Sequence, residues 1–232
     1  MVLNGKIVAV TGGFGQLGLA VVQAALEAGA QVAALDRARS PADAKALAGV
    51  LALGELDLAE PEAAVRALDQ VAARFGGLDA LVNVAGTFRW ESLEQGSLDT
   101  WDLLYRVNLR SAVSTSRAAL PHLIKRGGGR IVNIGAGAAV AKAGAGMGAY
   151  TASKSGVLKL TEALAEEVKD RGITVNAILP SIIDTPANRA DMPNADFSRW
   201  VAPRDIANVI VFLLSDEARA ITGALIPVSG RA

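Results

Sequence analysis

The residues that most clearly predict chemistry are a tyrosine and a lysine, Tyr150 and Lys154, in the stretch YTASK. Their spacing puts both side chains on one face of a helix. A free tyrosine has a pKa of about 10, which is too high for a base near neutral pH. A neighbouring ammonium group stabilises the phenolate and lowers that pKa, so the phenol can exchange a proton with a substrate oxygen. We therefore predict a proton-transfer site; the alternative is an exposed aromatic ring beside a solvated lysine.

Such a site usually keeps a second hydrogen-bond donor near the reacting oxygen, yet no hydroxyl side chain lies between Gly135 and Ala149. Loss of one oriented donor costs about 3 kcal/mol, or roughly a hundredfold in rate. The site is expected either to be slow on simple carbonyl compounds or to take its donor from elsewhere. The candidates are a backbone N–H of the glycine-rich loop, an ordered water, the substrate, or Lys142, for which a solvated loop lysine is the alternative.

A second candidate site is the glycine-rich stretch VAVTGGFGQLGLA, between an apolar run and a helical pattern. Glycine there permits unusual dihedral angles and lets a pyrophosphate approach backbone N–H groups at the positive end of a helix. The predicted cofactor contacts in this loop are Gly12, Gly13, Phe14, Gly15, Gln16, Leu17 and Gly18. A tight strand-to-helix turn without a ligand is the alternative.

Asp36 strengthens the dinucleotide interpretation, because it ends the second apolar run, 18 residues after Gly18. A carboxylate at that place accepts hydrogen bonds from the adenosine ribose and repels a 2′-phosphate. We therefore expect NAD to be favoured over NADP, although Arg37 and Arg39 follow directly and soften this preference. An ordinary turn carboxylate is the alternative for Asp36.

These residues need elements that bring them together. Short β-branched apolar runs alternate with alanine-rich helical patterns such as 18–30 and 150–170, which is typical of βαβ units and a buried parallel sheet. The expected strands are 6–12, 31–36, 49–57, 78–86, 129–136, 173–180 and 224–230. We predict one α/β domain over residues 1–232, a Rossmann-like doubly wound parallel sheet of about seven strands with helices on both faces.

Composition excludes several classes of function. Lys and Arg total 23, as do Asp and Glu, so no basic surplus predicts a nucleic-acid or acidic-membrane partner. The chain has no cysteine and a single histidine, His122, which excludes disulfides, thiolate nucleophiles, a His-based metal site and a Ser-His-Asp triad. His122 is expected on a helix surface. With no signal peptide and no apolar segment of about 18 residues, we predict a cytoplasmic protein with a small-molecule substrate.

In order and spacing, the motifs resemble those of the short-chain dehydrogenases/reductases, in their compact single-domain branch, from about residue 5 to the C-terminus. The matching motifs are the glycine-rich turn 11–18, Asp36, LDL at 56–58, NVAG at 83–86, Asn108 in RVNL, YTASK at 150–154 and NAILPSIIDTP at 176–186.

The resemblance implies hydride transfer with Tyr150 as acid/base, Lys154 also holding the nicotinamide ribose, and Asn108 holding a water in a proton relay. For Asn108, a structural amide that bends a helix is the alternative. The implied cofactor contacts are Asp57 and Leu58 beside the adenine, Asn83, Ala85 and Gly86 along the cleft, and Pro180, Ile183 and Thr185 by the nicotinamide. Together with apolar residues on more than one face of helix 150–170, the resemblance implies a homotetramer, or at least a dimer.

Two positions depart from the family pattern. The branch usually reads TGxxxGxG, whereas this chain has Gly15 followed by Gln16, a spacing similar to that of longer-chained relatives. The family's serine falls on Ala136 by alignment of the preceding strand and on Gly137 by counting back from Tyr150, and neither carries a hydroxyl. Some family members that reduce C=N bonds of pterin-like rings, or C=C bonds, also dispense with this serine. A substrate other than a ketone is therefore credible.

The segment between Thr185 and Trp200 corresponds to the family's substrate lid and is brief here. A short lid with small residues at 135–139 predicts an open pocket. Arg189, Met192 and Trp200 are candidate substrate contacts, with lid packing as the alternative.

The leading prediction is an NAD(H)-dependent oxidoreductase acting on a small carbonyl, alcohol or C=N substrate. The alternative is an NAD(H)-binding protein with impaired catalysis that serves as a redox sensor or scaffold. The missing hydroxyl favours the alternative, whereas the presence of Asn108, Tyr150 and Lys154 together favours the enzyme.

Overall fold

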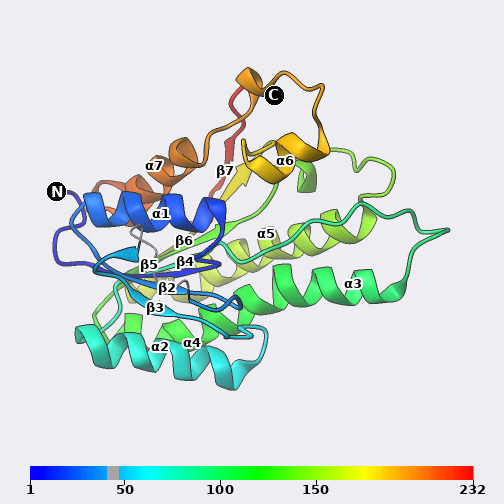
Figure 1. The fold of residues 1–232 in the computed structure, drawn as a ribbon. Coiled ribbons are helices and arrows are strands. Elements are labelled where there is room, and N and C mark those ends of the chain that lie inside the picture. The colour runs from blue at the N-terminus through cyan, green and yellow to red at the C-terminus, as the bar shows by residue number, and fades with distance from the viewer. Residues whose placement is uncertain (41–46, 232) are drawn as a thin grey trace.

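The structure, a computed structural model, describes residues 1–40 and 47–231. In these residues seven parallel strands form one sheet in the order β3-β2-β1-β4-β5-β6-β7 (Figure 1). The strands are β1 Ile7–Thr11, β2 Gln31–Leu35, β3 Leu51–Leu53, β4 Ala80–Asn83, β5 Gly129–Ile134, β6 Ile173–Pro180 and β7 Leu225–Val228. The predicted Rossmann-like α/β fold is confirmed.

Helices cover both faces of the sheet. They are α1 Gln16–Glu27, α2 Pro61–Phe75, α3 Leu98–Leu104, α4 Ser111–Lys125, α5 Gly148–Val168, α6 Pro186–Asp191 and α7 Pro203–Leu214, with a π-helix at Tyr105–Arg110 between α3 and α4. Figure 1 shows α1 and α7 on one face and α2, α4 and α5 on the other. Two large cores of buried aliphatic side chains fill the spaces between the sheet and these helices. None of the helices of residues 1–40 and 47–231 is long and apolar enough to cross a membrane.

The strands lie where the apolar runs predict them, but several are shorter than predicted. The run 49–57 gives only Leu51–Leu53, because Glu55 adopts a left-handed conformation with φ 59° and turns the chain out of the sheet. The run 78–86 gives only Ala80–Asn83, since the amide of Ala85 donates to the Thr11 hydroxyl at 3.1 Å instead of extending the strand. Both departures occur at the carboxyl ends of the strands, where the chain leaves the sheet.

The winding of the chain determines where a ligand can bind. It runs from β1 outward to β3, then returns to place β4 beside β1 and continues outward to β7. At this reversal the loops after β1 and β4 diverge to opposite faces of the sheet, and the carboxyl ends of the strands open a crevice. The candidate residues of the glycine-rich loop and of segment 83–86 follow these two strands.

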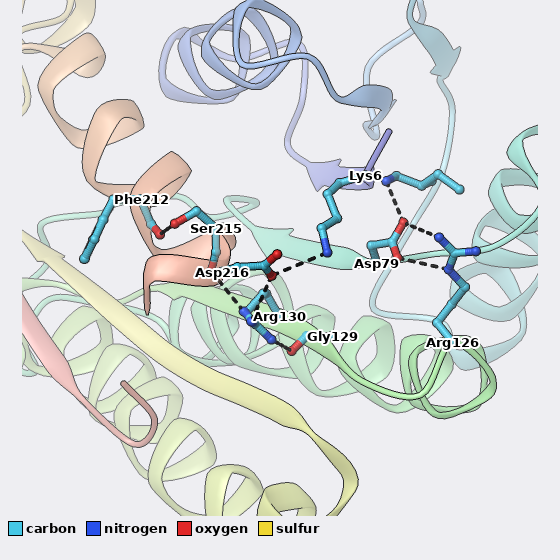
Figure 2. A network of polar contacts seen from close by, with 9 residues as sticks. Lys6, Asp79, Arg126, Gly129, Arg130, Phe212, Ser215 and Asp216 are labelled. Carbon is cyan, nitrogen blue, oxygen red and sulfur yellow. Dashed lines mark hydrogen bonds and ion pairs between the residues drawn. The ribbon is translucent and has the colours of Figure 1, made fainter. Parts of the chain in front are cut away.

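The opposite, amino-terminal edge of the sheet is held by a polar network (Figure 2). The Asp79 carboxylate accepts hydrogen bonds from the Ile7 amide at 2.8 Å and from the Arg126 guanidinium at 3.0 and 3.2 Å. Asp216 has longer contacts, 3.5 Å from the Lys6 amine and 3.6 Å from the Arg130 guanidinium. Asp79 thus ties the start of β1 to the start of β4 and the end of α4.

His122 lies on α4, in agreement with the prediction that it belongs to a helix. Its Nε2 is 3.0 Å from an Asp69 carboxylate oxygen on α2. The contact joins two helices on one face of the sheet.

Candidate active site

The carboxyl ends of the strands open into a cleft of about 1320 Å³. Pockets for drug-sized ligands measure about 300–1,000 Å³, so this cleft has room for a dinucleotide and a small substrate together. Its lining comes from the segments after six successive strands, β3 through β6 in sheet order, and from α5. The candidate cofactor and catalytic residues therefore converge on one cleft, although they are far apart in the sequence.

The glycine-rich loop forms one end of this cleft, where close backbone contacts require glycine. A Cβ on Gly12, whose φ is +63°, would lie 2.9 Å from the Ala85 backbone, and one on Gly18 would lie 2.0 Å from the Gly12 carbonyl oxygen. Gly15 is the N-cap of α1, and no side chain accepts from the first amides of this helix. An uncapped helix N-terminus that lines a cleft fits a pyrophosphate. Gly12 and residues 14–18 line the cleft, whereas Gly13 packs against Ala34 of β2.

Asp36 lies beside this loop, where the sequence predicts the ribose site. Its two carboxylate oxygens accept hydrogen bonds from the amides of Phe14 and Ala38, each at 2.9 Å. These contacts hold the carboxylate at the cleft wall while each oxygen retains a lone pair for a ribose hydroxyl. Arg37 also lines the cleft, whereas Arg39 lies outside the lining given by the described residues.

Asp57 and Leu58 follow β3 and line the part of the cleft where the sequence predicts the adenine. Arg106 reaches Asp57 at 2.8 Å and Glu60 at 2.6 Å. Burial alone would raise the pKa of the Asp57 carboxyl, but the hydrogen bond and charge of Arg106 hold this pKa below its ordinary value of 3.8. Arg106 also lines the cleft and was not among the predicted site residues.

Tyr150 and Lys154 lie in the middle of the cleft, on α5. The Lys154 amine is buried and donates to the Ile134 carbonyl oxygen at the end of β5, at 2.7 Å. Burial lowers the pKa of Lys154 to about 8. Burial also raises the pKa of Tyr150 to about 12, and the Phe88 ring meets the phenol edge-on at a centroid distance of 4.9 Å.

The predicted lowering of the Tyr150 pKa by Lys154 stays a prediction, because burial acts on this pKa in the opposite direction. The lysine amine is directed to a backbone carbonyl, and the phenol is enclosed by apolar neighbours, so desolvation of the phenolate dominates. A tyrosine with this pKa keeps its proton at neutral pH. It can act as a proton donor.

Asn108 lies in the π-helix, with 1% of its surface exposed. Its carboxamide oxygen accepts from the Thr87 amide at 2.7 Å, and its amide group donates to the Thr87 carbonyl and to the Ser153 hydroxyl, both at 3.0 Å. Ser153 in turn donates to the Tyr150 carbonyl oxygen at 2.7 Å. Both donors of Asn108 are thus used within the protein, which supports the structural interpretation of this side chain. A π-helical segment is itself frequent at functional sites.

Gly86 lies between the predicted catalytic groups. A Cβ at this position would be 3.2 Å from both the Asn108 oxygen and the Lys154 amine. Gly86 and Ala85 line the cleft, as do Pro180 and Ile183.

Two predicted cofactor contacts, Asn83 and Thr185, lie outside the described lining of the cleft. Asn83 is buried, donates to the Asn133 side chain at 2.8 Å and accepts from the Thr115 hydroxyl at 2.7 Å. Thr185 caps α6 by accepting from the Asn188 amide at 3.2 Å. Neither belongs to the lining given by the described residues, so their side chains support the cleft wall.

The loop after β5 carries the two positions that lack a hydroxyl. Ala136 lines the cleft, whereas Gly137 lies outside the described lining. A Cβ on Gly137 would lie 3.3 Å from the Pro180 carbonyl oxygen, so this loop packs against the end of β6. Ser181 follows Pro180 and lines the cleft, and its hydroxyl donates to the Ser229 carbonyl at 2.7 Å.

Of the predicted substrate contacts, Met192 lines the cleft, while Lys142, Arg189 and Trp200 lie outside the lining of the described residues. Arg189 binds Asp184 through two hydrogen bonds of 2.6 and 2.8 Å. Trp200 is 9% exposed. Phe197 packs against both of these residues, at 4.7 Å from the Arg189 guanidinium and 4.8 Å from the Trp200 ring centroid. These contacts agree with lid packing, the alternative prediction for Arg189 and Trp200.

The structure adds lining residues that the motifs missed: Phe88, Trp90, Arg106, Met147 and Ser181. Ser181 directly follows a predicted strand, close to the carboxyl end of the sheet where Asp36 ends another, and that position could have identified it. Phe88 and Trp90 follow segment 83–86 by a few residues. No local sequence pattern identifies Arg106, because its partner Asp57 is 49 residues away along the chain.

Comparison with known proteins agrees with this geometry. A family model described as short chain dehydrogenase matches residues 6–196. The chain is 34% identical to a 3-oxoacyl-acyl-carrier-protein reductase of Vibrio cholerae, over 99% of this chain and 98% of that protein. It is 31% identical to a D-beta-hydroxybutyrate dehydrogenase of Rhizobium meliloti, over 97% of each.

A solved short-chain dehydrogenase/reductase from Serratia marcescens superposes on this structure with a TM-score of 0.90 at 32% identity, covering 100% of this chain and 99% of that one. The family model covers most of the chain, and the similarity to the relatives extends over nearly their whole length. The chain therefore belongs to the short-chain dehydrogenase/reductase family.

Proposed function

We propose that this protein is an NAD(H)-dependent oxidoreductase that reduces a small carbonyl or C=N compound, or oxidises the corresponding alcohol or amine. The observation that carries the proposal is that one cleft is lined both by Tyr150 with the buried Lys154 and by the glycine-rich loop with Asp36. Hydride-transfer chemistry also agrees with the relatives, which are named as a reductase and a dehydrogenase.

The residues of the cleft fit a nicotinamide dinucleotide, which supplies or accepts the hydride when it is bound. The amides of residues 14–18 would hold the pyrophosphate, and Asp36 the adenosine ribose. Asp57 and Leu58 would lie beside the adenine, and Pro180 and Ile183 beside the nicotinamide. Asp36 favours NAD(H), because its charge opposes the additional phosphate of NADP(H).

Tyr150 is the proposed proton donor. At neutral pH its phenol is protonated, so it can protonate the substrate oxygen or nitrogen during reduction. Lys154 is cationic below its pKa of about 8 and stabilises the phenolate that proton transfer leaves behind. Asn108 positions Thr87 and, through Ser153, the turn of α5 that carries Tyr150.

Ser181 is the proposed second donor in place of the absent hydroxyl at positions 136 and 137. It lines the cleft next to that loop, as the approach of Gly137 to the Pro180 carbonyl indicates. Rotation about its Cα–Cβ bond would move its proton from the Ser229 carbonyl to a substrate oxygen. Lys142 is a weaker candidate, since it lies outside the described lining of the cleft.

The competing function is that of an NAD(H)-binding sensor or scaffold with impaired catalysis. Absence of a hydroxyl at Ala136 and Gly137 is the observation that favours it. If the protein is such a relic, Ala136→Ser should raise carbonyl turnover about tenfold or more by restoring one oriented donor. If Ser181 acts as donor, Ala136→Ser should help little and Ser181→Ala should lower turnover about tenfold or more.

The main experiment compares Tyr150→Phe with the unmodified protein. We expect the variant to lose most turnover, at least about a hundredfold, with NADH affinity nearly unchanged, because the phenol acts in the transition state. Steady-state rates on one ketone and one cyclic imine, together with NADH titration by fluorescence, provide the two readouts. Unchanged turnover in Tyr150→Phe would refute the mechanism.

We also propose that the protein assembles as a homotetramer, or at least as a dimer, partly through α5. Ala152 and Ala163 are exposed on this helix, eleven residues apart and so on nearly the same face. Small exposed side chains allow the same helix of a second copy to approach closely.

A further inference from the structure

The cleft has an apolar part beyond Tyr150, away from the glycine-rich loop. We define this outer pocket by the cleft-lining residues Phe88, Trp90, Met147, Ile182 and Met192. They come from the segments after β4, before α5 and after β6, and the Phe88 ring contacts the Tyr150 ring edge-on at 4.9 Å. Phe88, Trp90 and Met192 remain 47%, 65% and 36% exposed although they line a concave surface. Apolar surface left uncovered in a cleft favours an apolar ligand.

The aromatic side of this outer pocket is held in place. The Trp90 indole N–H donates to the Ala145 carbonyl at 2.9 Å, and the Glu91 amide donates to the Gly146 carbonyl at 2.9 Å. Gly146 has φ +74°, and a Cβ there would lie 2.3 Å from the indole ring. The indole therefore rests on a glycine backbone that only this residue type allows. Ordered aromatic rings present a fixed flat surface to a ligand.

Two methionines of the outer pocket add flexible apolar surface. Met147 precedes α5 and Met192 follows α6. Thioether side chains are flexible and polarisable, and they pack well against aromatic rings of varied outline. A planar ring inserted between these methionines and the Trp90 indole would bury apolar surface on both of its faces.

The charges near the outer pocket oppose an anionic substrate. Among the described residues that line the cleft, the cationic ones besides Lys154 are Arg37 and Arg106, which follow β2 and precede α4 at the adenine end. Arg106 is already paired with two carboxylates, Asp57 and Glu60. Asp191, the ionisable residue after β6 in this lining, carries the same sign as a substrate carboxylate. The Lys154 amine is buried and donates to the Ile134 carbonyl, so an anion in the outer pocket would lose hydration without gaining a free cationic partner among the described lining residues.

We propose that the substrate is a neutral aromatic ketone, or the corresponding secondary alcohol in the reverse direction, with its ring in the outer pocket and its carbonyl at Tyr150. This inference rests on the proposed function. In reduction, the carbonyl carbon gains a hydride from the reduced dinucleotide and the oxygen gains a proton from Tyr150. The C=O π bond is replaced by C–H and O–H bonds, the ketone is reduced and the dinucleotide is oxidised.

The test uses acetophenone and benzoylformate, which share a phenyl ketone and differ by a carboxylate. Binding of each to the protein–NADH complex is measured by calorimetry, and turnover is measured separately by NADH absorbance. We expect acetophenone to bind at least about tenfold more tightly than benzoylformate, since an unpaired anion is disfavoured in the outer pocket. Equal or tighter binding of benzoylformate, or no binding of acetophenone, would overturn the inference.

The two readouts separate this inference from the proposed function. If acetophenone binds preferentially but no ketone or imine is reduced, the ligand class stands and the proposed function fails. If reduction occurs but benzoylformate or an aliphatic ketone such as 2-butanone is preferred in binding, the function stands and the ligand class fails.

Matched variants test whether acetophenone binds in the outer pocket. Trp90→Ala should weaken acetophenone binding about tenfold by removing aromatic surface, with NADH affinity unchanged. Phe212→Ala is the control, because Phe212 is also exposed, at 47%, but lies on α7 outside the described lining of the cleft. Met192→Arg should shift the preference towards benzoylformate by supplying a cation. Equal effects of Trp90→Ala and Phe212→Ala would contradict the proposed location.

Discussion

Burial moves the pKa values of the two central residues in opposite directions. It raises the pKa of Tyr150 to about 12 and lowers that of Lys154 to about 8. Both changes favour the uncharged form of the side chain. Near neutral pH the phenol therefore holds its proton firmly, while the ammonium group is close to losing one. The phenol is therefore in the protonated form that reduction requires, and the Lys154 ammonium group would stabilise the phenolate that proton transfer leaves behind.

The first prediction concerns Lys154. Reduction should slow as pH rises through about 8, because the ammonium group that stabilises the Tyr150 phenolate loses its charge. The measurement is kcat/KM for ketone reduction between pH 6 and 10. Lys154→Arg should flatten this decline, since a guanidinium stays charged throughout. Persistence of the same decline in Lys154→Arg would assign it to another group.

The same residue provides a structural control that does not depend on turnover. The pKa of folded Lys154 lies below its ordinary value of 10.5, so the unfolded chain binds the extra proton between about pH 8 and 10.5. Over that range this residue's contribution to the free energy of unfolding should rise with pH. Lys154→Met should remove this contribution, which the difference between urea unfolding curves of the two proteins would show.

The second prediction concerns Asp36. NAD(H) should bind more tightly than NADP(H), and Asp36→Ala should narrow the difference by removing repulsion of the 2′-phosphate. Asp36→Ala also leaves the amides of Phe14 and Ala38 without their acceptor, so both affinities should fall somewhat. Fluorescence titration of both proteins with both cofactors measures the ratio. Tighter NADP(H) binding by the unmodified protein would be the contrary result.

At the scale of elements, the two edges of the sheet have different roles. The carboxyl edge carries loops that leave the strands early, as β3 and β4 show, and these loops line the cleft. The amino edge carries the Asp79 network, which contacts no residue of the cleft lining. Stability and ligand binding are therefore expected to be separable by mutation.

The third prediction tests this separation. The Asp79 side chain is 13% exposed, and Asp79→Ala leaves the Ile7 amide and Arg126 without their acceptor. We expect a loss of about 1–3 kcal/mol in the free energy of unfolding. Asp216→Ala is the matched control, because Asp216 is 71% exposed and its ion pairs are longer, so its loss should be below about 1 kcal/mol. Urea unfolding measures both.

The NADH affinity of Asp79→Ala shows whether the network at the amino edge also affects ligand binding. Folded Asp79→Ala should bind NADH as the unmodified protein does, since the network lies at the amino edge of the sheet. A large fall in affinity at a temperature where the variant is folded would show that the two edges are coupled.

At the scale of the whole molecule, the reversal of winding between β1 and β4 brings every part of the site to one edge of the sheet. Residues from the first turn of α1 to the segment after β6 meet there. The proposed assembly lies elsewhere, along α5, whose buried face supports Lys154. An interface on the exposed face of that helix would help to hold Tyr150 and Lys154 in position.

The fourth prediction is that light scattering at micromolar concentration reports a multiple of the 23.8 kDa chain mass, a tetramer or a dimer. Ala163→Arg should shift the mass towards the monomer, because it places a bulky charge on the proposed contact face of α5. Arg219→Ala, on an exposed residue away from this helix, is the control and should leave the mass unchanged. A monomer of unmodified protein would disprove the assembly.

The sequence by itself determined those features of the fold and of the candidate site that depend on the spacing of residues within one segment. The alternation of apolar runs and helical patterns predicted every strand of the described sheet, because side-chain periodicity reflects the buried faces of strands and helices. The glycine-rich loop, Asp36 and the Tyr150–Lys154 pair were identified in the same way. Each of these signals lies within a few residues or one βαβ unit.

Only the tertiary structure decided those properties of the site residues that depend on burial or on contacts between segments far apart in the sequence. It enclosed Tyr150 so that burial raises the pKa of the phenol, because desolvation sums over neighbours such as Phe88 from another loop. It directed the Asn108 side chain to Thr87 and Ser153, and it placed Arg189 and Trp200 in lid packing outside the described lining. These outcomes depend on how loops after different strands pack together, which periodicity along one segment does not specify.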